Sequence, residues 1–274
     1  MTSTRGSIYL DNHATTPLDE RVFLAMKPYF FADFGNPASQ THPYGWKAQD
    51  AVDQARLKLA AAINAHPSEI IFTASATEAT NLALKGLFFP QVTTTKRSVI
   101  ISSIEHSATL TTAHALEALG LRLVIIKPSK EGVITPELLS AHITDDTALV
   151  SFFLVHNEIG TINDIKALCA VAKRHNALIH CDGAQALGRI TIDCQELGID
   201  FLSLSAHKVY GPKGVGALYV RREIMPLLCP VIHGGGQEWQ KRSGTINVPG
   251  VVGFGEAAAI ANSDLHKDSS NIQY

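Results

Sequence analysis

Lys208 stands between two apolar segments, in the stretch SLSAHKVYGPKGVG of residues 203–216. A histidine precedes it and a Gly-Pro-Lys-Gly turn follows, so the stretch could be an ordinary surface loop. A lysine at the end of a buried strand could instead form an imine with an aldehyde, if burial beside other cations lowers the pKa of its amine. The residues that surround Lys208 in the fold decide between a surface loop and a covalent site.

Polar residues also follow four other apolar runs of the sequence. The run at 69–73 is followed by Ser75 and Glu78, whose S-x-x-E spacing is that of a capping box at a helix start. Such a helix start could bind a phosphate group, with Thr77 adding a hydroxyl, although both hydroxyls could serve as caps alone. The other polar groups at the ends of apolar runs are Glu105 and His106, then His156, Asn157 and Glu158, then Asp182 and Gln185, and finally Ser205, His207 and Lys208.

One cofactor needs this set of groups. In an open parallel sheet, ligands bind beyond the carboxyl ends of the strands, so these side chains could converge there. Pyridoxal phosphate requires an anion site, a carboxylate for its pyridine nitrogen, a hydrogen-bonding group for its phenolic oxygen and a lysine for its aldehyde. Each residue alone also fits a structural role as a cap or turn former. Their combination predicts a pyridoxal phosphate site around Lys208.

Other chemistries have weaker support in the sequence. The stretch GPKGVG at 211–216 matches neither the dinucleotide-binding nor the P-loop pattern. The HGGG stretch at 233–236 resembles an esterase oxyanion loop, but the chain has no G-x-S-x-G nucleophile motif. The four cysteines, Cys169, Cys181, Cys194 and Cys229, form no C-x-x-C pair. We therefore expect no metal site and interpret them as buried or incidental thiols.

The elements that must position these groups alternate between strands and helices. Apolar runs predict seven strands at 69–73, 98–102, 122–126, 148–154, 177–181, 200–204 and 215–220. Amphipathic patterns predict helices at 45–63, 77–87, 108–119, 164–175 and 251–261. This order indicates an α/β fold with a mostly parallel seven-stranded sheet flanked by helices. We expect an N-terminal arm at 1–18, one large domain at 19–261 and a frayed or disordered polar tail at 262–274.

The bulk composition is that of a globular protein. The 274 residues are 46% hydrophobic and 18% charged, with a net charge of −2, which gives no reason to expect a nucleic-acid or membrane partner. No apolar run approaches the roughly 20 residues of a membrane span. The N-terminal sequence lacks the apolar core of a signal peptide, so we expect a cytoplasmic protein.

Eight stretches of the chain resemble one known family. They are YLDNHATTP (9–17), FGNPAS (34–39), IIFTASATEATNLALKG (70–86), EHSA (105–108), HNEIGTI (156–162), HCDGAQALG (180–188), SLSAHKVYGPKGVGALYVRR (203–222) and GGGQEWQKRSGTINVPGVVGFGEA (234–257). In order and content they resemble the cysteine desulfurases of the class V aminotransferase family, which supply sulfur for iron–sulfur clusters. The RSGT-x-NVPG form is similar to the nitrogenase-type and housekeeping branch.

The resemblance implies a fold-type I large domain, pyridoxal phosphate as cofactor and a role for each matching residue. Lys208 would bind the cofactor covalently, Asp182 would pair with its pyridine nitrogen, and Gln185 would contact its phenolic oxygen. The remaining implied contacts are a ring stack and proton transfer by His106, a phosphate site of Ala76, Thr77, Ser205 and His207, contact of Asn157 with cofactor and substrate, and contact of Thr245 with the phosphate of a neighbouring subunit. The family therefore implies a homodimer that converts L-cysteine to L-alanine and passes the sulfur, as a persulfide, to a scaffold or acceptor protein.

The sequence departs from the family in three places. The family has a C-terminal small domain with a catalytic cysteine and a carboxylate-binding arginine, and we expect this chain to lack that domain. Cys181 is nearest the predicted site, but strand alternation should point it away. His13 and His156 also differ from the common family residues. Three interpretations stay open: a desulfurase-type chain that is inactive or partner-dependent, a non-catalytic cofactor-binding or dimerising module, and another class V aminotransferase or lyase that needs no cysteine.

Overall fold

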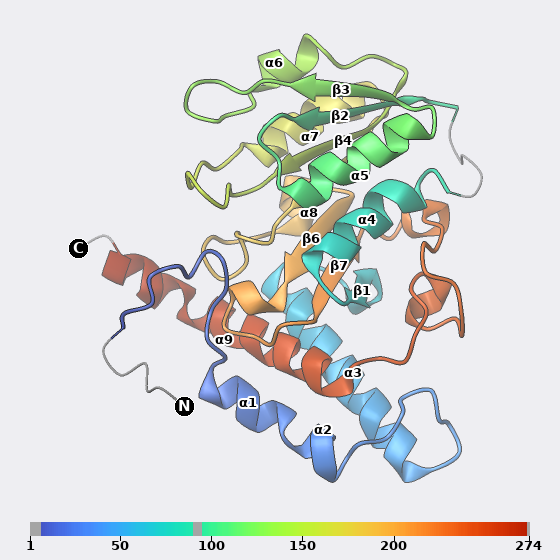
Figure 1. Cartoon of the computed structure of the whole chain (residues 1–274), viewed down its shortest axis with the longest axis vertical. Coiled ribbons are helices and arrows are strands. Elements are labelled where there is room, and N and C mark those ends of the chain that lie inside the picture. The colour runs from blue at the N-terminus through green and yellow to red at the C-terminus, as the bar shows by residue number, and fades with distance from the viewer. Residues whose placement is uncertain (1–6, 90–94, 273–274) are drawn as a thin grey trace.

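A seven-stranded sheet forms the centre of the molecule in the computed structural model, which describes residues 7–89 and 95–272 (Figure 1). The strands are β1 (Ile70–Thr73), β2 (Ser98–Ser102), β3 (Arg122–Ile126), β4 (Thr147–Phe153), β5 (Leu178–Asp182), β6 (Phe201–Ser205) and β7 (Gly216–Val220). Their order in the sheet is β1-β7-β6-β5-β4-β2-β3. All neighbouring pairs are parallel except those of β7, which runs antiparallel to β1 and β6. The predicted mostly parallel sheet is confirmed.

Helices cover both faces of the sheet. One face packs on α4 (Ala76–Gly86) and α5 (Ser107–Ala118) through one apolar core. The opposite face packs on α1 (Glu20–Met26), α3 (Pro43–Ala62), α7 (Ile165–Arg174) and α9 (Val248–Ile272) through a larger core. Because both faces are covered, the residues of β1, β2, β4, β6 and β7 are buried throughout, which accounts for their continuous apolar sequences.

The short elements of the chain were not predicted from the sequence. They are α2 (Pro28–Phe31), α6 (Pro136–Ser140), α8 (Cys194–Leu197) and the 3₁₀ turns η1 (Pro67–Glu69), η2 (Ala206–Lys208), η3 (Met225–Leu227) and η4 (Glu238–Gln240). The seven-residue α1 was also missed. Elements of one or two turns contain too few residues for a helical period to be recognised.

The last helix differs from its prediction. The sequence indicated a helix at 251–261 and a disordered tail, but α9 continues to Ile272, so the expectation of disorder over 262–272 is wrong; residues 273–274 lie outside the described residues. Leu265 is buried and continues the apolar face of Val251, Phe254 and Ala258 at helical spacing. Asp264 also lies 3.7 Å from Arg21 of α1. The polar composition of residues 262–272 therefore hid from the sequence analysis that Leu265 is an apolar contact and that Asp264 pairs with Arg21 of α1.

Close packing of α3 against α9 depends on a glycine. A Cβ on Gly255 would lie 2.6 Å from the Cα of Ala55, a distance that side chains do not tolerate. The two helices lie side by side beneath the sheet (Figure 1). No helix among the described residues has the length and apolar character needed to cross a membrane.

Candidate active site

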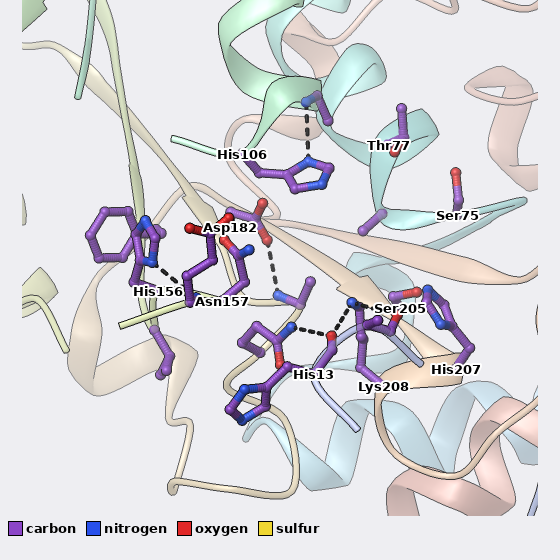
Figure 2. Close-up of a pocket in the computed structure, with 18 of the residues that line it drawn as sticks. His13, Ser75, Thr77, His106, His156, Asn157, Asp182, Ser205, His207 and Lys208 are labelled. Carbon is purple, nitrogen blue, oxygen red and sulfur yellow. Dashed lines mark hydrogen bonds between the residues drawn. The ribbon is translucent and has the colours of Figure 1, made fainter. Parts of the chain in front are cut away.

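A cavity of about 580 Å³ lies at the carboxyl ends of β4, β5 and β6, beside the first turns of α4 and α5 (Figure 2). Nine of the ten predicted site residues line it: Ala76, Thr77, His106, Asn157, Asp182, Gln185, Ser205, His207 and Lys208. The tenth, Thr245, is exposed in the segment between η4 and α9 and does not line the cavity. The strand-end reasoning therefore found most of this wall, because parallel strands bring their ends to one edge.

Lys208 lies on η2, directly after β6. Its Nζ donates hydrogen bonds to the backbone carbonyls of His13 and Ala14, the latter at 2.9 Å, so it faces the N-terminal segment (Figure 2). Burial lowers the pKa of the Lys208 ammonium, and the nearby Arg189 guanidinium lowers it further. Both effects favour the neutral amine, which is the nucleophilic form.

Two carboxyl groups sit close together beneath the cavity. Asp182 Oδ1 accepts the Ala184 N–H at 3.0 Å. Burial raises the pKa of Asp182, while this hydrogen bond, His106 and Lys208 oppose the rise. Burial, together with the Asp182 charge, raises the pKa of Glu105 well above its usual value. Glu105 accepts only the Phe153 N–H, at 3.2 Å, and its Oε2 is buried without a hydrogen-bond partner among the described residues. The surroundings therefore favour the protonated form of Glu105 more strongly than that of Asp182.

The start of α4 forms an anion-binding geometry. Ser75 Oγ accepts the Glu78 N–H at 3.1 Å, and Glu78 Oε2 accepts the Ala74 N–H at 2.9 Å. Arg242 anchors the same glutamate through a 2.7 Å bond to Oε1. Gly216 of β7 packs directly behind this turn, since a Cβ there would lie 2.5 Å from the Ser75 carbonyl carbon. Ser75 caps the Glu78 N–H, while the preceding N–H groups of Ala76 and Thr77 have no acceptor within the helix and can meet an anion.

His106, labelled in Figure 2, and Gln185 both line the cavity. His106 is the N-cap of α5, where its Nδ1 accepts the Ala108 N–H at 3.1 Å. This bond fixes the ring orientation. Gln185 donates from Nε2 to the His13 carbonyl at 2.9 Å, but its Oε1 is buried without a partner among the described residues. A phenolic hydroxyl placed beside Gln185 would satisfy that acceptor.

A buried hydrogen-bonded chain supports this face of the sheet. It runs from Thr80 of α4 to Ser203 of β6 (3.0 Å), then to His180 of β5 (2.9 Å) and Ser151 of β4 (2.7 Å). Burial lowers the pKa of His180 to about 3, so this histidine is neutral. The chain ties α4 to the three strands whose ends carry site residues. Sequence reasoning missed it, because each member looks like an ordinary strand or helix residue.

Sequence reasoning also missed the N-terminal wall of the cavity. Asp11, His13 and Ala14 line it. Thr16 fixes this segment to the lysine turn, since its Oγ1 donates to the His207 carbonyl (3.0 Å) and accepts the Tyr210 N–H (2.8 Å). The segment precedes the first strand, so strand ends could not place it. The YLDNHATTP motif was the only signal.

His156, which the sequence analysis listed among the polar strand-end residues and noted as a departure from the family, is a wall residue too. Its Nε2 lies 3.0 Å from the Ile104 carbonyl, and its Nδ1 accepts the Glu158 N–H at 3.1 Å. Nε2 must therefore carry the proton and act as the donor. Its ring also meets Phe153 edge to face, with 4.9 Å between centroids. This histidine is a fixed part of the wall.

The cysteines lie away from the cavity. Cys181 is fully buried on the opposite face of β5, as strand alternation predicted, and burial raises its pKa well above the usual value. Burial also raises the pKa of Cys169 to about 12 and that of Cys194 well above its usual value. Cys229 is half-buried. Within residues 7–89 and 95–272, no cysteine lines the cavity, and no cluster of His, Cys, Asp and Glu suits a metal ion.

The residues present fit pyridoxal phosphate. The fit rests on a lysine with a lowered pKa, a buried carboxylate, an unpartnered amide oxygen and an open helix N-terminus, all around one cavity. Pyridoxal phosphate presents an aldehyde, a pyridine nitrogen, a phenol and a phosphate, which are the complementary groups.

The sequence is similar to those of curated proteins named as cysteine desulfurases. A mitosomal cysteine desulfurase of Trachipleistophora hominis is 46% identical over 98% of this chain and 62% of its own length. The cysteine desulfurase IscS of Pseudomonas putida is 47% identical over 97% of this chain and 66% of its own length. The chain thus spans just under two thirds of the length of these curated relatives.

Solved structures agree with this similarity. A NifS-like protein superimposes with a TM-score of 0.92 and 39% identity, over 96% of this chain and 72% of that one. The protein SspA in complex with cysteine superimposes with a TM-score of 0.88 and 42% identity, over 92% of this chain and 72% of that one. Residues 8–273 match the Aminotransferase class-V family. The chain therefore belongs to the class V aminotransferases, a pyridoxal phosphate-dependent family, and within it to the group of NifS- and IscS-like cysteine desulfurases.

Proposed function

We propose that this chain binds pyridoxal phosphate at Lys208 and takes part in the desulfuration of L-cysteine to L-alanine. The observation that carries the proposal is the convergence of nine predicted cofactor residues around one cavity, with the Lys208 amine inside it. Relatives named as cysteine desulfurases, and a neighbouring structure described as bound to cysteine, support the choice of substrate. The chain spans 62–66% of the length of those relatives.

The proposed roles follow from the chemistry of each side chain. When bound, the cofactor supplies a ring that withdraws electrons from the α-carbon of the amino acid. Asp182 would hold a proton on the pyridine nitrogen, and the α4 N-terminus with Ser205 and His207 would bind the phosphate. Lys208 would bond to the cofactor aldehyde carbon and later move the α-proton. His106 would cover the ring, and Asn157 would orient the substrate.

Sulfur transfer requires a second thiol. The carbon–sulfur bond of cysteine breaks, the sulfur bonds to an acceptor thiol to give a persulfide, and the carbon takes up a proton to give alanine. No described cysteine lines the cavity, and the three buried thiols have raised pKa values that disfavour the thiolate. The acceptor thiol would therefore come from outside the described residues, and we expect little alanine from the purified 274-residue chain unless a thiol is added.

The lack of a described cysteine at the cavity also fits two other candidate functions. A class V aminotransferase or lyase needs no acceptor thiol, and a non-catalytic cofactor-binding module needs no turnover at all. The desulfurase proposal expects alanine to rise when an added thiol such as dithiothreitol is present. A lyase or aminotransferase would turn over an amino acid regardless of the thiol, and a module would turn over none.

The working unit would be a homodimer that delivers sulfur to an acceptor or scaffold protein of iron–sulfur cluster assembly. Thr245 supports a dimer, since it lies outside its own cavity and is exposed. In a dimer it would complete the phosphate site of the partner chain. A cytoplasmic location stays a prediction of the N-terminal sequence.

Absorption spectroscopy of the purified chain with pyridoxal phosphate tests the cofactor proposal. We expect a visible band, and after borohydride reduction a single labelled peptide that carries Lys208. Lys208→Ala should abolish band and label, whereas Lys213→Ala, an exposed lysine five residues away, should keep both. A label spread over surface lysines, or one retained in Lys208→Ala, would contradict the assignment.

A further inference from the structure

The buried hydrogen-bonded chain lies one layer beneath the floor of the cofactor cavity. Its four side chains are fully buried, and they belong to Thr80, Ser203, His180 and Ser151. The three strand members each stand two residues before a residue that lines the cavity, namely Ser205, Asp182 and Phe153. Side chains two positions apart in a strand point to the same face of a sheet. The chain therefore supports the site directly from below.

His180 joins the strands because both of its ring nitrogens are engaged. Nδ1 lies 2.7 Å from Ser151 Oγ, and Nε2 lies 2.9 Å from Ser203 Oγ. Burial lowers the pKa of His180 to about 3, so the ring is neutral, with one donor and one acceptor nitrogen. A hydroxyl can both donate and accept, so both contacts are hydrogen bonds. Three neighbouring strands are thus connected by directional bonds at one level of the sheet.

Thr80 is the point at which this chain reaches α4. Its Oγ1 donates to Ser203 Oγ at 3.0 Å. Over residues 7–89 and 95–272, this is the one hydrogen bond that joins α4 to a strand of the sheet. The other contacts of α4 with the sheet are apolar, through Ala79, Leu82 and Ala83. Apolar contacts are non-directional, whereas a hydrogen bond requires a defined distance and angle. Thr80 therefore fixes the position of α4 on the sheet.

The same two elements must be aligned for a phosphate to bind. Ala76 and Thr77 offer N–H groups at the start of α4, one helical turn before Thr80. Ser205 and His207 line the cavity from the end of β6 and the turn that follows it (Figure 2). Hydrogen bonds weaken when the donor–acceptor distance or angle departs from its narrow range. A small displacement of α4 relative to β6 would therefore weaken several phosphate contacts together.

We propose that Thr80, Ser203 and His180 are positioning residues, which fix α4 against the strand ends and thereby make the site selective for a phosphorylated ligand over its dephosphorylated form. The inference rests on the proposed function for the class of ligand, a substituted pyridine that carries a phosphate. The three residues do not line the cavity, so they act through the N–H groups of Ala76 and Thr77.

The test compares two ligands that differ by the phosphate. Pyridoxine 5′-phosphate and pyridoxine both lack the aldehyde, so neither forms a covalent bond with Lys208. Calorimetric and ligand-observed NMR titrations of the full chain give the two affinities. Charge-assisted hydrogen bonds predict that the wild type prefers the phosphorylated ligand by about 10- to 100-fold. Thr80→Val keeps the side-chain shape without the hydroxyl, and it should weaken binding of pyridoxine 5′-phosphate about 3- to 10-fold while the affinity for pyridoxine stays within about 2-fold.

Three further variants make the test independent of one substitution. Ser203→Ala breaks the chain from the side of the sheet and should reduce the preference at least as much as Thr80→Val. Thr80→Ser restores the hydroxyl and should restore the wild-type preference. Thr109→Val is the matched control on the neighbouring helix α5. Thr109 is fully buried, and its Oγ1 has no hydrogen-bond partner among the described residues, so its removal should leave the preference unchanged.

A structural role alone gives a different result. Equal weakening of both ligands in Thr80→Val and Ser203→Ala would indicate a general loss of the fold and would overturn the proposal. A wild-type chain that does not prefer the phosphorylated ligand, or a preference unchanged in both variants, would overturn it as well. Absence of a Lys208 label or of alanine formation would refute the proposed function, while the ratio of the two affinities would still report on Thr80.

Discussion

The pKa values of three residues at the cavity, Lys208, Asp182 and Glu105, are shifted in directions that suit cofactor binding. Lys208 must lose a proton to react, and burial together with Arg189 favours that loss. Asp182 must keep a negative charge, although burial opposes it. Glu105 competes for the same charge because it is buried next to Asp182, and it has the more strongly raised pKa. A protonated Glu105 would leave Asp182 as the anion of this pair, placed to hold a proton on the pyridine nitrogen of a bound cofactor.

Replacing Glu105 by glutamine should stabilise the protein at alkaline pH. The unfolded chain releases the Glu105 proton above about pH 4.5, whereas the folded chain retains it up to the raised pKa. The free energy of unfolding therefore falls as pH rises through this window, by about 1.4 kcal/mol per pH unit. Glutamine mimics the protonated acid and removes that loss. Urea unfolding at pH 5 and pH 8 measures it, with an advantage for Glu105→Gln expected at pH 8 and a smaller one at pH 5.

An exposed glutamate on the following helix provides the reference. Glu117 of α5 has a side chain that is 53% exposed, so Glu117→Gln should change stability by less than about 0.5 kcal/mol at either pH. A Glu105→Gln protein that is less stable than wild type at both pH values would show that Glu105 is ionised in the fold.

The sequence predicted side chains better than it predicted their partners. Lys208, Asp182, Gln185 and His106 were found because polar residues at strand ends are visible in one dimension. The hydrogen bonds of Lys208 to the His13 and Ala14 carbonyls were not predicted from the sequence. They join residues almost 200 positions apart, and backbone carbonyls leave no trace in a sequence. The buried state of Glu105 also depends on tertiary packing.

Among the elements, the turn before α9 combines strain with a buried ion pair. Glu238, Trp239 and Gln240 all have positive φ, at 48°, 53° and 64°, which costs about 1 kcal/mol or more per residue. Arg56 of α3 holds the turn through bonds of 2.9 and 2.7 Å to both Glu238 carboxylate oxygens. Glu238 also accepts the Phe72 N–H at 2.7 Å. The rings of Phe72 and Trp239 lie 4.7 and 4.4 Å from the guanidinium.

Removing Glu238 should release this turn. Glu238→Ala leaves Arg56 buried without its counter-charge, and we expect a loss of about 3–5 kcal/mol in the free energy of unfolding. Glu256→Ala breaks an exposed pair with Lys58 and should cost less than about 1 kcal/mol. Denaturant unfolding compares the two variants. Equal small losses would mean that the buried pair does not hold the turn.

Prediction of elements succeeded where a pattern was long enough. All seven strands were found within two residues of each bound, because both faces of the sheet are covered and the strands are apolar throughout. The antiparallel direction of β7 was not predicted, since direction depends on the connection and not on composition. The end of α9 was missed because one buried leucine among polar residues carries little weight in a one-dimensional pattern.

At the scale of the whole molecule, one end carries exposed aromatic residues. They lie on α1, α2, the connection between α2 and α3, and the start of α3, at the lower end of the molecule in Figure 1. These residues are Phe23, Phe30, Phe31, Phe34, Tyr44 and Trp46, each 46–75% exposed. A group of large apolar side chains on a protein surface is typical of an interface. Together with the exposed Thr245, this surface agrees with the proposed homodimer.

Mixing two defective variants tests whether Thr245 acts across the dimer. Lys208→Ala cannot bind the cofactor covalently, and Thr245→Val lacks the hydroxyl for the phosphate, which should weaken cofactor affinity about 10- to 100-fold. In a mixed dimer, the Thr245→Val chain supplies Lys208 while the Lys208→Ala chain supplies Thr245, so one complete site forms. At limiting pyridoxal phosphate, borohydride labelling of Lys208 should therefore rise on mixing well above the level of either variant alone. If Thr245 serves its own chain, the mixture will show only the average of the two. Phe31→Asp and Phe34→Asp, added to both variants, should prevent the rise if the aromatic end is the dimer contact, because a buried unpaired charge opposes association.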